Sequence, residues 1–574
     1  MAGMSPPASA PHPAPSRSRG EFLRRQWAWT PAWIFAAFLG FLILYPFTLL
    51  FLAGFQHEDG GFTFANYARI FSDEAMRDQI WATLWLAAVR SILATALGIF
   101  LAWVTARTDT PFRGAISAFV WIGYFAPALP LLLAWVLLAG RVGLINTFLQ
   151  QMGLAAGPLL DIYSYGGIIF VSTLSFAGLV YILIEPSFRA MDANLEESSR
   201  MCGASNVQTL FRITIPTMAP AVLGALIYVF VLAVESFEAE LILGTPARIY
   251  VLSTGIYALT QEYPQDIPGA ATLSAVILLL VTLMIIAQQR LLANRSFVTV
   301  SGKGTAVRRI RLGKWRWLTF AICFLYFLLA VALPMAVLLA GTFMRGWGIW
   351  DADHLTLANW SGFFADPRLT EAIGNTVWLG VGVGLIGAFG ALLIAYLTTR
   401  TRFPGNPLLI FASWAPRTAP SVVFGVACAW AFIGGTSLLH PLLGTVWIFI
   451  LVLFANSLPV ATRAVTGAMH QIGPELEQAA RITGASWTRM MRSVLLPLLK
   501  PVLVSTFILL FLLATRNLSL LLFFYTPDSR VLSAVLWEAW SGNAPLQGLV
   551  AGTVMMLLSC LVLALARLSG HKMG

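Results

Sequence analysis

The sequence predicts an all-α polytopic membrane protein with about twelve transmembrane helices, arranged as two parallel six-helix repeats. Composition, a series of long apolar runs and an internal duplication support this prediction. Of the 574 residues, 58% are hydrophobic and only 11% are charged, and the mean hydropathy is +0.79. A soluble domain carries about 25% charged residues, so this chain has too few charges to solvate the surface of a globule of its size.

The apolar runs are each long enough to cross a bilayer, which takes about 20 residues. They lie near 29–54, 82–105, 116–140, 164–186, 219–243, 268–289, 317–342, 374–397, 407–433, 443–462, 501–524 and 546–566. Because the hydrocarbon core offers no water to backbone groups, every run is predicted to be a helix.

The distribution of basic residues predicts the orientation of the chain. Lys and Arg number 26 in the segments on the side of the N-terminus and seven in the loops on the other side. Basic loops stay in the cytoplasm, so both termini are predicted to be cytoplasmic. The net charge of +11 is thus explained by topology, and no nucleic-acid partner is expected. Arg90, Arg417 and Arg516 fall inside apolar runs.

Five segments follow along the chain. We expect a disordered cytoplasmic N-terminus over 1–28, which is rich in Pro, Ala and Ser, and a first repeat over 29–293. A basic cytoplasmic linker over 294–316, a second repeat over 317–567 and a cytoplasmic tail over 568–574 complete the chain.

The two repeats match in their loops as well as in their apolar runs. ATLWLAAV (82–89) recurs as NTVWLGVG (375–382), and TARTDTPFRG (105–114) recurs as TTRTRFPG (398–405). Six runs per repeat is an even number, so the two halves are predicted to insert with the same orientation.

The strongest internal match lies in one loop of each half, residues 191–222 and 472–503, which align without a gap. Each loop predicts a helix that ends at a glycine, which can take the left-handed position after a helix. A serine then caps a second short helix, and Pro216 and Pro497 are expected to punctuate the chain before the next span. The candidate functional residues are Glu196, Glu197, Arg200 and Gly203 in the first loop, and Glu477, Gln478, Arg481 and Gly484 in the second.

This paired loop resembles the EAA loop of binding-protein-dependent ABC importer permeases. The motif stands here as Glu197-Ser198-Ser199 with Gly203, and as Gln478-Ala479-Ala480 with Gly484. The resemblance implies the type I importer permease fold, in which each loop forms a coupling helix that docks on a cytoplasmic ATPase. It also implies a complex in the inner membrane of a bacterium, containing this chain, two copies of the ATPase and one extracytoplasmic binding protein.

The chain lacks the residues for ATP chemistry of its own. SGKGT (301–305) lacks the upstream glycine and the strand–loop–helix context of a phosphate-binding loop. The six histidines and four cysteines form no cluster in sequence. We therefore expect a transport subunit rather than an enzyme, with no catalytic residue, no cofactor and no assigned metal site.

A secondary transporter of the six-plus-six type is the alternative from a different class, because it too is built from parallel repeats. Such proteins usually carry a G-x-x-x-D-R-x-G-R-like loop between spans 2 and 3. Here that loop is TARTDTPFRG, which lacks the signature, and the alternative leaves the paired loops unexplained.

Two further stretches suggest the substrate. ESFEAELILGTPARIYVLSTGIY (235–257) and ATRNLSLLLFFYTPDSRVLSAVLWEAW (514–540) look like the corresponding parts of ferric-iron uptake permeases. Related permeases import thiamine, polyamines or phosphonates, so these substrates remain alternatives.

Charged residues near the membrane spans are candidates for the translocation path, because such charges usually face a protein interior or a water-filled cavity. Glu235 and Glu238 are three residues apart and would share a helix face, whereas Glu240 would point elsewhere. Glu235 aligns with Arg516 in the repeat, which suggests an ion pair that closes the path. Helix packing or contact with the binding protein is the alternative role for the acids, and simple hydration at the interface is the alternative for the pair.

Overall fold

The structure is a computed structural model that describes residues 29–56, 61–191, 193–293, 309–347, 355–434, 438–542 and 544–568. The predicted N-terminal segment 1–28, most of the linker and residues 569–574 lie outside these ranges. Within them, the secondary structure is helical apart from two isolated β-bridges.

The first half of the chain forms the helices α2 to α14. Their bounds are α2 Thr30–Leu39, α3 Tyr45–Ala53, α4 Ala65–Ser72, α5 Glu74–Arg107, α6 Arg113–Phe125, α7 Ala128–Ala139, α8 Leu144–Gln151, α9 Tyr165–Ala190, α10 Ala193–Met201, α11 Asn206–Thr209, α12 Ile215–Val234, α13 Leu252–Gln261 and α14 Ile267–Ala293.

The second half forms the helices α15 to α26. Their bounds are α15 Trp315–Phe327, α16 Leu333–Gly341, α17 Ala358–Ala365, α18 Pro367–Arg400, α19 Asn406–Trp414, α20 Ser421–Ile433, α21 Val446–Gln471, α22 Glu475–Ile482, α23 Trp487–Met490, α24 Leu496–Thr515, α25 Leu532–Ser541 and α26 Pro545–Leu568. The three central pairs of equivalent helices have equal lengths: α5 and α18 have 34 residues each, α9 and α21 have 26, and α12 and α24 have 20. The predicted duplication is therefore visible in the fold.

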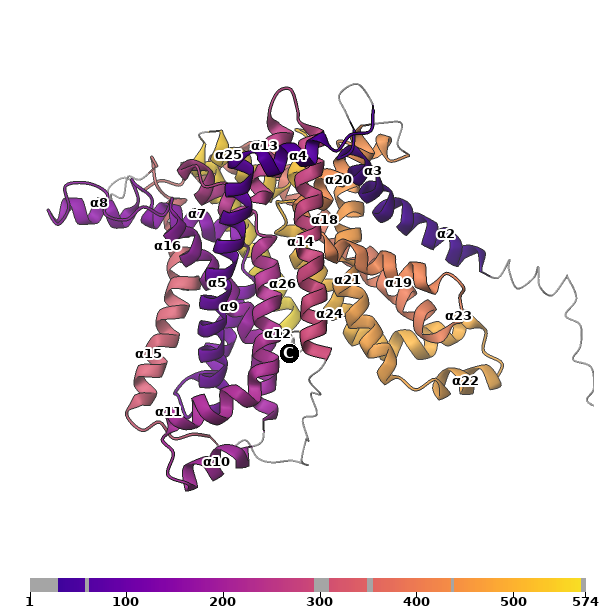
Figure 1. Ribbon diagram of the computed structural model, residues 1–574, viewed down its shortest axis with the longest axis horizontal. Coiled ribbons are helices and arrows are strands. Elements are labelled where there is room, and N and C mark those ends of the chain that lie inside the picture. The colour runs from indigo at the N-terminus through magenta and orange to yellow at the C-terminus, as the bar shows by residue number, and fades with distance from the viewer. Residues whose placement is uncertain are drawn as a thin grey trace, which may run out of the picture.

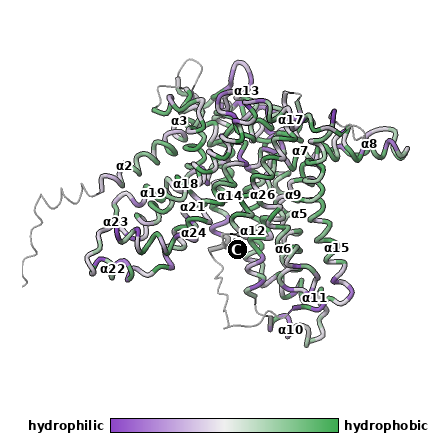
Figure 2. The backbone as a smooth tube through the Cα atoms, turned by 180° about the vertical axis from the view of Figure 1, so that it is seen from behind, coloured by the Kyte–Doolittle hydropathy of each residue, from purple (hydrophilic) through white to green (hydrophobic). Residues whose placement is uncertain are grey.

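Eleven helices among the described residues are long and apolar enough to cross a membrane, and a bent helix pair raises the number to twelve. Each half has the same central trio of packed helices, α5 with α9 and α12 in the first, and α18 with α21 and α24 in the second. In Figure 2 hydrophobic residues run through the middle of the molecule, whereas hydrophilic residues gather on the small helices at its ends.

The third apolar run of each half differs from the prediction of one continuous helix. The run 116–140 divides into α6 and α7, and the run 407–433 divides into α19 and α20, which the 3₁₀ turn η7 (Ala415–Thr418) separates and which are bent by 114°. The break falls at an extended alanine directly before a proline, Ala126 in one half and Ala419 in the other. A proline disfavours the helical conformation of the residue before it, so hydropathy alone overestimated the continuity of both runs.

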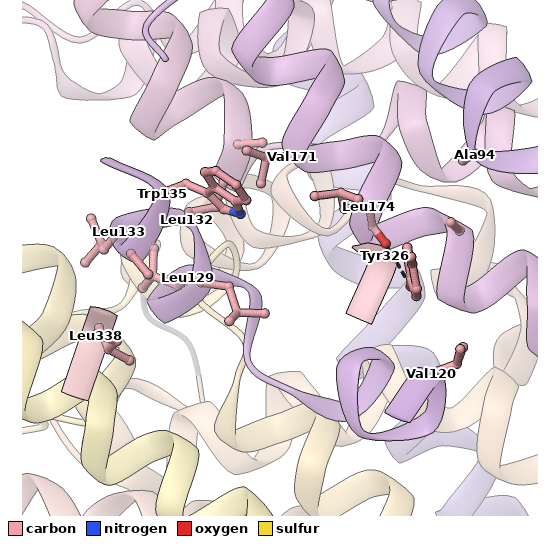
Figure 3. Close-up of a cluster of buried hydrophobic side chains, with 14 of the residues drawn as sticks. Ala94, Val120, Leu129, Leu132, Leu133, Trp135, Val171, Leu174, Tyr326 and Leu338 are labelled. Atoms are coloured by element: carbon pink, nitrogen blue, oxygen red, sulfur yellow. Dashed lines mark hydrogen bonds between the residues drawn. The ribbon is translucent and has the colours of Figure 1, made fainter. Parts of the chain in front are cut away.

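The first helices of each half pack against the other half. Helices α2 and α3 pack on α19 and α20, while α15 and α16 pack on α6 and α7 (Figure 1). Aromatic pairs fix both crossings: the ring centroids of Phe47 and Phe424 lie 5.4 Å apart, and those of Phe119 and Phe327 lie 3.9 Å apart. In Figure 3, Tyr326 of α15 donates a hydrogen bond to the backbone oxygen of Leu174 on α9, at 3.2 Å, within a buried apolar cluster.

Proline positions explain the π-helical turns. Five such turns occur among the described residues: η1 Gly40–Leu44, η2 Leu210–Thr214, η3 Glu240–Gly244, η5 Leu328–Ala332 and η9 Met491–Leu495. Each ends two residues before a proline, at Pro46, Pro216, Pro246, Pro334 and Pro497. A proline ring meets the carbonyl four residues earlier, which is the middle of each turn. The wider turn lets an α-helix continue past four of these prolines, whereas the turn before Pro246 leads into a short 3₁₀ turn that ends at Ala247.

The crossing of the first helices predicts that the two halves hold together without the linker. We expect two polypeptides cut between residues 300 and 301 and produced in the same cell to copurify in detergent. The double substitution Phe47→Ala/Phe119→Ala should reduce the copurified fraction, since an aromatic pair contributes about 0.5–1.5 kcal/mol beyond its buried area. Trp378→Ala is the matched control, because Trp378 makes an edge-to-face contact with Trp447 within the second half. Failure of the unsubstituted halves to copurify would contradict the prediction.

Candidate functional site

The two predicted coupling loops fold as expected. Each is a short helix, a glycine turn and a second short helix, formed by α10 and α11 in the first half and by α22 and α23 in the second. Gly203 has φ +85° and Gly484 has φ +81°, which is the left-handed position that glycine takes after a helix. Ser205 accepts the N–H of Gln208 at 3.2 Å, and Ser486 accepts that of Arg489 at 3.3 Å. Both loops lie at the same end of the molecule (Figure 1).

The prolines after the loops do not interrupt the helix, contrary to prediction. The helix runs from α11 through η2 into α12, and from α23 through η9 into α24. Pro216 and Pro497 are the second residues of α12 and α24. The π turns accommodate each proline, so the second short helix and the long helix that follows are continuous. A displacement of the short helix therefore acts directly on the long one.

In the first half, Glu196 faces inward rather than toward a partner. Its carboxylate forms an ion pair with Arg107 at 2.5 Å, and the side chains are 0% and 1% exposed. The Thr214 hydroxyl donates to the other carboxylate oxygen at 2.8 Å, and Arg107 also donates to the backbone oxygen of Met191 at 3.2 Å. Arg107 is the last residue of α5 and Met191 follows α9, so this pair joins α10 to the ends of both helices.

The second half repeats this arrangement in a looser form. Glu477 contacts Arg400, the last residue of α18, at 2.8 Å, with side chains 8% and 12% exposed. Arg400 donates to the backbone oxygens of Met469 at 2.9 Å and of Ile472 at the end of α21. We call these two arrangements, Arg107–Glu196 and Arg400–Glu477, the helix-end ion pairs.

The other predicted coupling residues lie differently. Glu197 is half-buried in α10, while Gln478 and Arg481 are exposed on α22. Arg200 belongs to α10, and its side chain lies outside the described set. The last residue of each coupling helix is a large apolar side chain that is 86% exposed, Met201 in α10 and Ile482 in α22. The pair is visible in the sequence as an apolar position two residues before each motif glycine, but the predicted set did not include it.

The predicted path residues lie where the central helices end. Helix α12 stops at Val234 with Glu235 as its C-cap, and α24 stops at Thr515 with Arg516 as its C-cap. The expectation that Glu235 and Glu238 share a helix face is wrong, because the chain leaves the helix between them. Ser253 and Ser533 hold the two broken segments in equivalent ways, by donating to the backbone oxygens of Ser236 and Asn517.

The predicted ion pair between Glu235 and Arg516 is not formed among the described residues. Glu235 pairs instead with Arg417 of η7, at 3.7 Å, because the bend between α19 and α20 brings this arginine to the end of α12. Arg417 stacks over the ring of Tyr228 on α12, at 5.3 Å. Arg417 is visible in the sequence as a charge inside an apolar run, but its partner is not.

Arg516 contacts the first half by another route. It stacks over the ring of Tyr124 on α6 at 5.7 Å, and it donates to the backbone oxygen of the same residue at 3.0 Å. Glu238 lies close enough to Arg516 for an electrostatic interaction. Arg417 and Arg516 both belong to the second half, and both therefore lie against the first half, at the centre of the molecule.

Glu240 has a different partner from Glu235 and Glu238. It is fully buried and forms an ion pair with Arg90, which also donates to the backbone oxygen of Ala233 at the end of α12. The Ser236 hydroxyl donates to the second carboxylate oxygen of Glu240 at 2.7 Å. Arg90 thus fixes the break after α12. Within the described ranges, no three His, Cys, Asp or Glu side chains lie close enough together to hold a metal ion.

Comparison with known proteins gives the family. The model of the binding-protein-dependent transport system inner membrane component matches twice, over residues 94–297 and 380–573. The ferric transport system permease protein FbpB of Actinobacillus pleuropneumoniae is 28% identical over 520 residues, which cover 86% of this chain and 71% of that protein. The spermidine/putrescine transport system permease protein PotB of Haemophilus influenzae is 23% identical over 46% of this chain and 93% of its own.

A solved structure of a bacterial ABC transporter that imports the acidic polysaccharide alginate aligns over 47% of this chain and 98% of its own, with 21% identity and a TM-score of 0.40. The two matches to the family model together cover more than half of the chain, one in each half. The chain therefore belongs to the family of binding-protein-dependent transport system inner membrane components, and it carries the family's unit twice.

Proposed function

We propose that this chain is the membrane permease of an ATP-driven importer that takes up iron(III) from an extracytoplasmic binding protein. The chain supplies both halves of the membrane unit. ATP hydrolysis belongs to two copies of a separate cytoplasmic ATPase, one for each coupling helix. Both termini lie in the cytoplasm under this proposal, in the inner membrane of a bacterium.

One observation carries the coupling role. Met201 and Ile482 occupy equivalent positions in the two halves, and each is 86% exposed at the tip of a polar helix. A large apolar side chain exposed in the same way on both halves suits burial in a groove on a partner. Two equivalent tips at one end of the molecule support two identical docking partners.

The substrate is proposed from the relatives. FbpB, named for ferric transport, matches over 86% of the chain and so includes both halves. PotB, named for spermidine and putrescine, matches over 46% of the chain. A polyamine importer is therefore the second candidate.

Uptake by the reconstituted complex tests the substrate. The permease, its ATPase and its binding protein are placed in sealed vesicles, with ⁵⁵Fe(III) or ¹⁴C-spermidine bound to the binding protein outside. We expect ATP-dependent accumulation of iron and none of spermidine, and a proton or sodium gradient should not replace ATP. Accumulation of spermidine alone would overturn the iron assignment, and gradient-driven uptake would overturn the ABC mechanism.

The apolar tips predict a specific loss of ATPase docking. Met201→Ser/Ile482→Ser should still insert but should copurify with much less ATPase, because each substitution removes an apolar anchor. The matched control is Cys202→Ser/Thr483→Ser, which changes the next residue in each half. Equal ATPase yields from both double variants would refute the role of the tips.

Substitution of the coupling glycines is predicted to impair substrate-stimulated ATP hydrolysis through the backbone angle φ alone. A Cβ at Gly203 or Gly484 would meet nothing within 4 Å, so crowding cannot explain a defect. A left-handed conformation costs an L-residue about 1–2 kcal/mol, and a β-branched residue suits it worst. Gly203→Val/Gly484→Val should therefore lose substrate-stimulated ATP hydrolysis, while Gly203→Asn/Gly484→Asn should retain most of it, because asparagine tolerates this conformation. Undiminished stimulation in the valine variant would contradict the prediction.

Breaking the two helix-end ion pairs is predicted to reduce the stability of the permease by unequal amounts. Glu196→Gln leaves Arg107 buried without a counter-charge, and breaking a buried pair costs about 3–5 kcal/mol. Glu477→Gln should cost less, since its partner Arg400 is partly exposed. Thermal unfolding of the purified permease measures both, with the exposed neighbour Glu475→Gln as control. A larger loss in Glu477→Gln than in Glu196→Gln would contradict this order.

A further inference from the structure

Charged and aromatic side chains from both halves meet at the centre of the molecule. We call them the central charge cluster, and its members are Glu235, Glu238, Arg417, Arg516, Tyr124 and Tyr228. Tyr124 connects the two arginines, since it stacks under Arg516 and also lies close enough to Arg417 for an electrostatic interaction. The helix-end ion pairs and the Arg90–Glu240 pair lie outside this cluster.

The two signs of charge come from different halves. Both carboxylates belong to the segment where α12 ends, in the first half. Both guanidiniums belong to the second half, Arg417 in η7 and Arg516 at the end of α24. When the halves separate to open a path between them, one wall of that path is acidic and the opposite wall is basic.

One carboxylate of the cluster is left without a full set of partners. The Glu235 side chain is only 10% exposed, and its Oε1 atom is buried with no hydrogen-bond partner among the described residues. Its contact with Arg417 is 3.7 Å long, beyond hydrogen-bond distance. The guanidinium carbons of Arg417 and Arg516 lie over tyrosine rings, at 5.3 and 5.7 Å from the ring centroids. Each planar guanidinium keeps N–H groups on its edge for an oxyanion.

Charge balance then decides between two forms of the cargo. The two carboxyl groups can at most offset the charge of the two guanidiniums, so a bare trivalent cation would bring its whole charge into the cluster and would be repelled by two fixed guanidiniums. A ferric ion that carries a bound oxyanion avoids both problems. Its metal can take carboxylate oxygens from the acidic wall, while its anion accepts hydrogen bonds from the basic wall. Each ion pair that the cargo breaks is thereby replaced.

We propose that iron(III) crosses this permease together with a bound oxyanion, with Glu235 and Glu238 facing the metal and Arg417 and Arg516 facing the anion. This inference rests on the proposed function and adds the chemical form of its substrate. No bond is made or broken beyond exchange of oxygen ligands at the metal, and iron remains in the ferric state.

The test measures whether anion and metal enter together. The reconstituted complex is supplied with ⁵⁵Fe(III) bound with ³²P-phosphate in one series and with ¹⁴C-citrate in another, in buffer that lacks other oxyanions. We expect at least one labelled anion to accumulate with iron in a constant ratio, in an ATP-dependent manner. Iron accumulation with neither label would overturn the inference and leave the proposed function standing. Absence of ATP-driven iron uptake in the unsubstituted complex would overturn the proposed function, and the inference with it.

Variants then test the residues. Arg417→Gln/Arg516→Gln should reduce uptake of the labelled complex at least tenfold, while the Lys versions should retain part of it. Glu235→Gln/Arg417→Gln removes both charges of one ion pair, so it guards against misfolding from a lone buried charge and should also reduce uptake. Arg345→Gln, at an exposed position outside the cluster, is the control. Copurification with the ATPase verifies that each variant is folded, and unchanged co-transport in the folded arginine variant would refute the assignment.

Discussion

A membrane interior has no water to satisfy an interrupted helix, so every interruption in this chain must be satisfied by protein. The structure meets this constraint in two ways. Where a proline falls inside a long helix, a π turn often carries the helix past it, as before Pro216 and Pro497. Where the helix does stop, as at Val234 and Thr515, side chains from neighbouring segments bind the backbone beyond the break. The breaks after Val234 and Thr515 lie where the two halves meet, and the proposed path between the halves needs polar groups there.

The two halves share a backbone but not all of their charges. The lengths of the central helices, the glycine turns, the helix-end ion pairs and the ends of α12 and α24 repeat in both halves. The charged residues around the ends of α12 and α24 do not repeat, since Glu235 corresponds to Arg516, and Arg90 corresponds to Val383. Under the proposed function, the repeated features serve the coupling of both halves to identical partners. Under the same proposal, the unrepeated ones belong to a single path with two different walls.

Local features of this fold could be predicted from the sequence, whereas long-range partners could not. Apolar runs fixed the spans, and the motif glycines fixed the turns at Gly203 and Gly484, because these depend on neighbouring residues. Hydropathy does not report bends, so the breaks before Pro127 and Pro420 were missed. Glu196 meets an arginine 89 residues away, and Glu235 meets one brought in by such a bend. An alignment of repeats relates equivalent positions, but it does not say which of them touch.

The crossing of the first helices also sets an order of synthesis. The face of α6 and α7 is complete once Ala139 has been made, but its covering helix α16 ends only at Gly341. At about 5–20 residues per second, a ribosome needs roughly 10 to 40 s to cover that distance. During this interval the face of α6 and α7 lies in the membrane without its covering helix. The nascent chain is then exposed to membrane proteases and to pairing with a neighbouring chain, so translation speed between the halves becomes part of how this protein reaches its native state.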